Sequence, residues 1–134
     1  MIVQERFIPS EMAVLLKKKG FDCACISYYV YFSSAVTLYS GLVPEFSDSY
    51  IDHNEYDGRY SRPTQQMVLE WLRAEHNIHL VPVYKKTEEG IVYTAVDILG
   101  KEHGFRMEAK SKDNVPYENI MDAGIMYCLE NIIK

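Results

Sequence analysis

The chain has 134 residues, of which 48% are hydrophobic and 25% are charged, and its formal net charge is −5. This composition is that of a folded globular protein, and it excludes an intrinsically disordered chain. The acidic balance argues against a non-specific nucleic-acid binder, because such proteins need a basic surface that displaces counterions from phosphates. The length matches one domain, so we expect a single domain over residues 1–134.

Two features of the sequence predict the cellular compartment: its targeting and membrane-spanning signals, and its number of cysteines. The first residues show no basic region followed by an apolar run, and no stretch approaches the ~18 apolar residues of a spanning helix. Cys23, Cys25 and Cys128 are an odd number for a disulfide framework, which favours a reducing compartment. We therefore expect a cytoplasmic protein with no contact to a membrane.

The first half of the chain is predicted to begin with a helix that starts near Pro9 and stops at Gly20. A strand follows over residues 23–32, which are rich in Ile, Tyr, Val and Cys. Residues 40–62 are polar, acidic and tyrosine-bearing, and they show no steady period of 2 or 3.6. This pattern predicts a long loop.

The second half predicts a helix after Pro63-Thr64, with Trp71 on its apolar and buried face. Three strands over 78–84, 91–98 and 105–109 are expected to form an antiparallel meander, and a last helix begins at 116 or 117 and ends near 133. Pro82 lacks a backbone N–H, so its strand should lie at a sheet edge. The predicted fold class is α+β: a three-stranded meander flanked by helices, with the N-terminal helix–strand unit extending the sheet beyond residues 105–109.

Alternation along the meander predicts two different sheet faces. If the hairpins pair symmetrically about their loops, Val81, Val83 and Val96 belong to the face on which the helices pack. The opposite face then presents five large apolar or aromatic side chains to solvent or to a partner. These predicted interface residues are Ile78, Leu80, Tyr84, Ile91 and Tyr93. A homodimer through this face, or cover by the N-terminal half, is the expected consequence.

Three segments in different parts of the chain bear a family resemblance. They are residues 16–22 leading into Tyr28-Tyr29, residues 63–66 leading into 71–73 and then 76–78, and the helix start at 117–118 followed by 123–125. Together they resemble a family of small proteins of uncharacterised function that phages and prophages of the Bacteroidetes encode. The resemblance implies a bacterial host cell as the location. It implies no site residues, because the matching positions are helix starts and core positions.

Asp97, Glu108 and Lys110 form the sharpest catalytic pattern. An Asp followed by Glu-x-Lys on the next strand resembles the signature of restriction-endonuclease-like nucleases, in which two carboxylates hold Mg²⁺ and the lysine stabilises charge at the phosphate. The competing interpretation is an ordinary cross-strand ion pair, since the expected register sets Asp97 opposite Arg106. We favour the ion pair, because Glu-x-Lys is common on solvent-facing strands.

Two further clusters of possible metal ligands lack the spacing of a metal site, so we expect neither a metal nor a cofactor. Five carboxylates lie within residues 45–57, but Gly58 falls one place too late for a calcium loop. His76 and His79 straddle a helix end, where they lack the helical spacing that makes two ligands converge. No phosphate-binding loop, nucleophile elbow or dinucleotide fingerprint occurs.

The sequence therefore favours a non-enzymatic accessory protein of a phage or prophage. Such a protein would act by binding an unidentified protein partner or by self-association. The alternative is a Mg²⁺-dependent nuclease that uses Asp97, Glu108 and Lys110.

Overall fold

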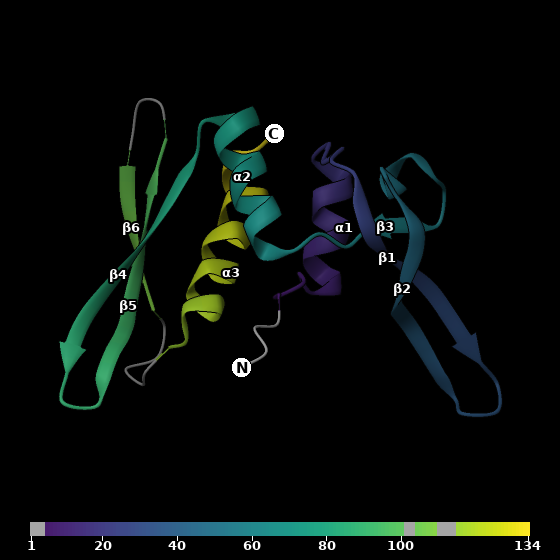
Figure 1. Cartoon of the computed structure of the whole chain (residues 1–134), viewed down its shortest axis with the longest axis horizontal. Helices are drawn as coiled ribbons and strands as arrows, with labels where there is room; N and C mark the ends of the chain where they lie inside the picture. The colour runs from purple at the N-terminus through teal and green to yellow at the C-terminus, as the bar shows by residue number, and fades with distance from the viewer. Residues whose placement is uncertain (1–4, 101–103, 110–114) are drawn as a thin grey trace. The chain divides into compact units, whose positions relative to one another are not determined.

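The computed structural model describes residues 5–100, 104–109 and 115–134. The chain divides into two compact units, Met1–Thr64 and Gln65–Lys134, which are described separately (Figure 1). A single domain over the whole length stays a prediction. Within the described ranges, none of the helices is long and apolar enough to cross a bilayer.

The first unit contains a helix, a three-stranded antiparallel sheet and one turn of 3-10 helix. In chain order these are α1 (Ser10–Lys18), β1 (Cys25–Ser34), β2 (Tyr39–Ile51), η1 (His53–Glu55) and β3 (Arg59–Ser61). The strand order is β2-β1-β3, with β1 in the centre. The predicted helix is confirmed, although no side chain caps its start, and Gly20 follows it with a positive φ of 87°.

Two predictions for this unit are wrong. Residues 40–62 are not a long loop, since they form β2, η1 and β3. The N-terminal strand does not extend the meander, because β1 lies in a separate sheet and has β2 and β3 as its two neighbours. The cause is the same for both errors: β2 is an edge strand with no fully buried residue, so it shows no hydrophobic alternation.

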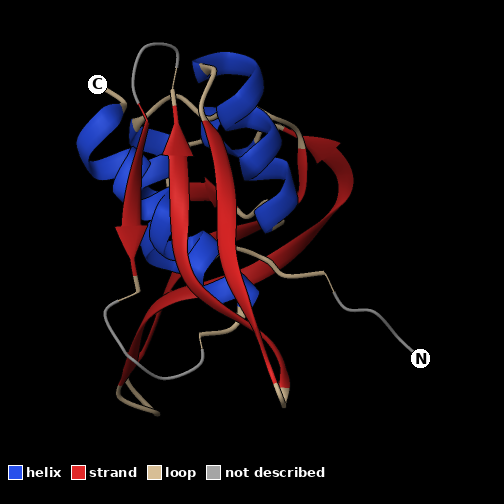
Figure 2. Cartoon of the chain, turned by 90° about the vertical axis from the view of Figure 1, so that its left-hand side faces the viewer, coloured by secondary structure: helices blue, strands red, loops and turns tan. Residues whose placement is uncertain are grey.

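The second unit contains the predicted meander and two helices, which confirms the α+β class. Its elements are α2 (Gln65–His76), β4 (His79–Thr87), β5 (Gly90–Leu99), β6 (Gly104–Glu108), α3 (Tyr117–Tyr127) and the π-helical turn η2 (Cys128–Ile132). The antiparallel order β4-β5-β6 places Pro82 on an edge strand, as predicted. Figure 2 shows this sheet face on, with helices behind it. Trp71 of α2 is buried, with 4% of its surface exposed.

Val96 belongs to the face of this sheet that contacts α3, as predicted, but the first half of β4 faces the opposite way to the prediction. Gly124 of α3 sits so close to the sheet that a Cβ atom there would lie 3.2 Å from Val96 and 3.3 Å from Leu80. Leu80 pairs with Ile98, and Val81 pairs with Asp97. The register shifts between Val83 and Tyr84, where β5 has one extra residue. This bulge reverses the facing of the first half of β4, because side chains alternate with a period of two.

Candidate functional site

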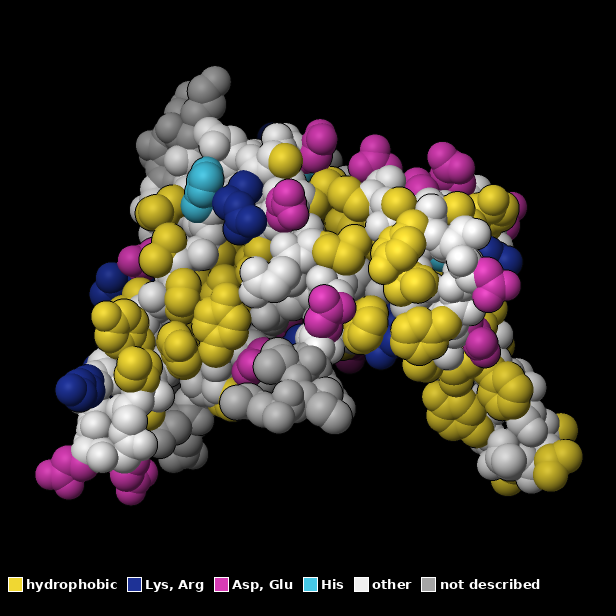
Figure 3. All heavy atoms as spheres, viewed as in Figure 1, with side chains coloured by type: hydrophobic (Ala, Val, Ile, Leu, Met, Phe, Trp, Pro, Cys, Tyr) yellow, Lys and Arg dark blue, Asp and Glu magenta, His cyan; other side chains and the backbone are white. Residues whose placement is uncertain are grey.

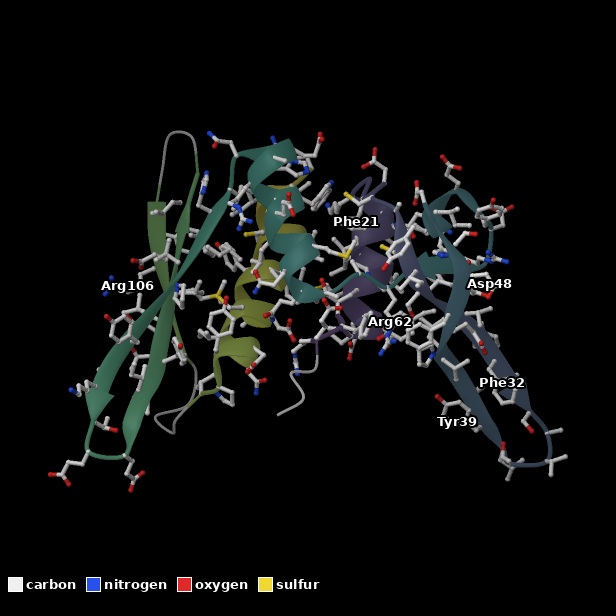
Figure 4. All side chains as sticks on the ribbon, viewed as in Figure 1. Phe21, Phe32, Tyr39, Asp48, Arg62 and Arg106 are labelled. Carbon is white, nitrogen blue, oxygen red and sulfur yellow. The ribbon has the colours of Figure 1, made fainter. Side chains whose placement is uncertain are left out.

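Asp97 and Glu108 lie on the same face of the second sheet, as predicted, but the register places Asp97 directly opposite Arg106. The Arg106 guanidinium donates to both carboxylate oxygens of Asp97, at 2.7 and 3.1 Å. These hydrogen bonds hold the pKa of Asp97 below its ordinary value. Lys110 lies outside the described residues. The cross-strand ion pair is confirmed, and its Arg106 is labelled in Figure 4.

The structure does not bring the five predicted interface residues onto one open face. Ile78 is buried, Leu80 lies against Gly124 of α3, and the Tyr93 ring contacts the Tyr117 ring edge-on at 5.5 Å. Tyr84 and Ile91 are exposed, at 63% and 59%. The predicted homodimer through this face therefore lacks the continuous patch on which it was based.

The other predicted clusters have structural roles. Asp52 accepts a hydrogen bond from the Asn54 backbone at 2.9 Å and so caps η1. The His76 ring contacts the Trp71 ring edge-on at 4.7 Å, and His79 lies 3.3 Å from Asn77 Oδ1. Within the part of the chain that the structure describes, no three His, Cys, Asp or Glu side chains are close enough to share a metal ion.

The two buried cysteines are poor nucleophiles. Burial raises the pKa of Cys25 to about 12 and that of Cys128 to about 11. Both groups are therefore thiols at neutral pH, and the thiolate is the reactive form.

A cavity of about 520 Å³ lies between β6 and α3. Its wall is largely apolar and includes Met107, Ile120 and Tyr127, with Glu108 and Glu130 among its polar residues. Asp97 is not part of this wall, so the cavity does not join the two carboxylates of the nuclease pattern.

The surface that stands out is the end of the β1–β2 hairpin. We call residues 31–42 the arm: the last four residues of β1, the turn 35–38 and the first four residues of β2. At its tip Val36 and Leu38 are 94% and 90% exposed, and Tyr31, Phe32 and Tyr39 are also exposed. Figure 3 shows hydrophobic side chains along this hairpin to its tip, and Figure 4 labels Phe32 and Tyr39 on it.

The arm is also free of charge. Residues 23–44 contain no Asp, Glu, Lys or Arg. The hairpin of β4 and β5 is the internal contrast, because its end contains Lys85, Lys86, Glu88 and Glu89. Sequence reasoning missed the arm, although the uncharged run of 22 residues was a readable signal. Exposed hairpins usually contain charged residues, as the hairpin of β4 and β5 does, because charge on exposed strands prevents association. An exposed hairpin without charge is therefore unusual.

The arm is a two-stranded ribbon. β3 pairs only with residues 28–30 of β1, so it covers the root of the hairpin and stops there. Beyond Val30, no described strand pairs with the outer edge of either β1 or β2. A two-stranded ribbon is marginally stable alone in water, and its open edges are templates for a further strand.

The tip of the arm has a leucine where a hairpin turn prefers another residue type. Leu38 has a φ of 57°, in the left-handed region that favours Gly or Asn. Its side chain is almost fully exposed, so no described intramolecular packing accounts for a leucine at this position. Backbone strain with an exposed apolar side chain points to a contact outside the unit.

Aromatic rings and arginine guanidinium groups surround the root of the arm on both sheet faces. The Arg62 guanidinium lies 4.2 Å from the Phe7 ring centroid and 5.4 Å from that of Tyr29, and Figure 4 shows Arg62 at this position. The Arg59 guanidinium lies 4.6 Å from the Tyr28 ring centroid. These cation–π contacts stabilise the packing of side chains at the root of the arm.

His53 packs against residues at the root of the arm. Its ring is fully buried and stacks on Tyr28 with centroids 4.5 Å apart, and its Nε2 donates to the Cys25 carbonyl at 3.1 Å. Its Nδ1 has no hydrogen-bond partner in the described structure. Burial lowers the pKa of His53 below its ordinary value of 6.5. The imidazole is therefore neutral in the folded unit at neutral pH.

We expect the stability of the first unit to fall as the pH drops below about 6.5. Because the pKa of His53 is lowered in the folded state, the unfolded chain binds a proton at this residue at a higher pH than the folded chain does. The contribution is fully present above the unfolded pKa and decreases as the pH falls through the folded pKa. Urea unfolding at several pH values measures it.

His53→Phe should reduce this pH dependence, and His79→Gln, which removes an exposed histidine, should leave it unchanged. Equal pH dependence in the wild type and in His53→Phe would show that His53 is not the responsible group.

Comparison with known proteins adds no functional information. No family model, curated protein or solved structure matches the chain. The geometry of the arm is therefore the basis for a functional assignment. A ribbon with open edges, exposed aromatic side chains and no charge can bind another macromolecule.

Proposed function

We propose that this chain is a non-enzymatic accessory protein of a phage or prophage, and that it binds a macromolecular partner through the arm in the cytoplasm of the host cell. The observation that supports the proposal is the near-complete exposure of Val36 and Leu38 at the tip of an uncharged ribbon. Apolar area left in water forfeits about 25 cal/mol for each Å². An arm that is permanently unpartnered would be expected to have a polar tip.

The residue types on the arm fit a binding surface. Aromatic side chains dominate the energy of protein interfaces, because they bury much area with few rotatable bonds. Tyr31, Phe32 and Tyr39 supply three such rings within the arm. Phe32 and Tyr39 stand with ring centroids 6.2 Å apart, so they present one continuous aromatic surface.

No specific observation favours the nuclease alternative. Both oxygens of Asp97 accept hydrogen bonds from Arg106, and Asp97 lies on an open sheet face. A two-carboxylate Mg²⁺ site needs oxygens that are free to converge on one ion. Mg²⁺-dependent cleavage of DNA or RNA that disappears in Glu108→Gln would contradict the proposal.

Site-specific photocrosslinking tests the binding role. A photoreactive benzoylphenylalanine placed at Val36 should form covalent adducts larger than the free chain in infected or lysogenic cells, because the tip is in contact with the partner. The same residue at Glu88, the end of the charged hairpin, is the matched control and should form few adducts. Equal adduct yields at both positions, or none at Val36, would overturn the proposal.

A second variant separates binding from folding. Leu38→Gly removes the exposed side chain and also relieves the positive φ, so it should leave the unit at least as stable while reducing adduct formation at Val36. Undiminished adducts with Leu38→Gly would show that Leu38 makes no contact with the partner.

A further inference from the structure

The arm has two requirements that any occupant must satisfy. The first is a strand, because the ribbon beyond Val30 has unpaired backbone groups along both edges. The second is an uncharged contact, because residues 23–44 contain no charge that could pair with one. A lipid bilayer meets only the second requirement, since open sheet edges do not occur in the hydrocarbon region. The occupant is therefore a polypeptide that adds a strand.

The outer edge of β2 shows where that strand is added. Residues 39–43 contain neither charge nor proline, whereas Pro44 cannot donate a hydrogen bond and Glu45 follows it directly. Proline and charge are the devices by which native edges resist pairing. They limit the open stretch of the β2 edge to residues 39–43, which we call the pairing window.

We propose that the occupant is a second copy of this chain, with the two pairing windows joined antiparallel across a two-fold axis. This inference rests on the proposed binding role of the arm. An antiparallel pair of identical five-residue windows places the middle residue, Gly41, opposite its own copy. Tyr39 then lies opposite Val43 of the other copy, a favourable aromatic and β-branched pair.

The distribution of charge favours the arm over other surfaces of the chain as the place where two copies make contact. Each chain has a net charge of −5, so most approaches of two copies bring like charges together. At the arm, two acidic chains could meet without any charged side chain of residues 23–44 in the contact. The four-stranded sheet formed, β1-β2 of one copy with β2-β1 of the other, also leaves two fewer open edges.

The size of the contact predicts a weak dimer. Five residues from each copy bury much less than the roughly 800 Å² per partner of a standard stable interface. We expect a monomer of 15.5 kDa at low micromolar concentration, with the mean mass rising toward twice that value near millimolar concentration in sedimentation experiments. A strictly monomeric chain over this whole range would overturn the inference.

A pair of cysteine variants tests the geometry. Gly41→Cys places a thiol opposite its own copy, so mild oxidation should produce a disulfide-linked dimer. The φ of Gly41, 159°, is one that L side chains rarely adopt, and a Cβ there would lie 3.2 Å from the Tyr39 hydroxyl. Far-UV circular dichroism must therefore show first that Gly41→Cys keeps the wild-type fold. Ser33→Cys on β1 is the matched control and should remain monomeric. A dimer in Ser33→Cys and none in Gly41→Cys would assign the pairing to the β1 edge instead and overturn the inference. Cys23 is replaced by Ser in both variants, because it is the partly exposed native cysteine.

Charge variants test the energy of the same contact. Ser33 and Ser40 are direct cross-strand neighbours in the arm, and both are exposed. Ser40→Lys puts a cation inside each pairing window, so the association constant should fall at least about tenfold, whereas Ser33→Lys should change it by less. Equal weakening by both variants would contradict pairing through β2.

Two outcomes separate this inference from the function on which it rests. Photoadducts at Val36 with a different protein, together with a monomeric purified chain, would leave the binding role intact and remove the second copy as partner. Flotation of the chain with phosphatidylcholine vesicles, lost in Leu38→Gly, would show that the arm contacts a membrane and would overturn the strand-pairing inference.

Discussion

Trp71→Ala should lower the free energy of unfolding by about 3–5 kcal/mol, the usual range for removing a large buried aromatic side chain. Trp71 is 4% exposed, and its neighbours Val68 and Leu72 on the same helix are fully buried. Truncation to a methyl group removes the transfer free energy of the indole and leaves a cavity that the surrounding side chains fill only in part. Urea unfolding followed by far-UV circular dichroism measures the loss. Tryptophan fluorescence cannot be used, because the variant removes the only tryptophan.

Two control variants show whether the loss comes from core volume. Trp71→Phe keeps an aromatic ring in the site and should cost about half as much or less. Arg73→Ala, at an exposed position of the same helix, should change stability by less than about 0.5 kcal/mol. A loss below about 1 kcal/mol in Trp71→Ala would mean that the ring contributes little to the core. The indole would then be interpreted as an interface anchor.

Asn54→Ala should destabilise the first unit by about 2–4 kcal/mol. The Asn54 side chain joins two backbone segments that are far apart in sequence. Its Nδ2 donates to the Phe21 carbonyl at 2.9 Å, and its Oδ1 accepts from the Ser61 backbone N–H at 2.9 Å. The alanine leaves both partly buried backbone groups without their partner, and each such loss costs about 1–3 kcal/mol. Denaturant unfolding of the variant and the wild type measures the difference.

Asn131→Ala is the matched control, because it deletes the same amide where only one exposed hydrogen bond, to the Tyr127 carbonyl at 3.2 Å, is lost. It should change stability by less than about 1 kcal/mol. If the two asparagine variants were equally stable, the Asn54 hydrogen bonds would not be what holds η1 and β3 to the chain after α1. The root of the arm would then depend on the stacked Tyr28 and His53 rings, the cation–π contacts of Arg59 and Arg62, and the pairing of β1 with β3.

The sequence by itself determined the elements that bury one face against their own unit. The helices, the strands of the meander and the edge position of Pro82 follow from apolar periodicity and from the missing proline N–H. The Asp97–Arg106 pair was also predictable, because β5 and β6 pair symmetrically about their connection without a bulge. In each of these cases the information lies within a few residues of the element itself.

The tertiary structure alone decided two features of the sheets, the pairing of β2 and the facing of the first half of β4. β2 has no fully buried residue, so its pairing with β1 leaves no alternating pattern in the sequence. The bulge between Val83 and Tyr84 adds one residue to β5, and this shift turns Leu80 toward α3 because strand side chains alternate from face to face. The arm needed both kinds of information: its lack of charge is written in residues 23–44, whereas its exposure depends on β3 ending at the root of the hairpin.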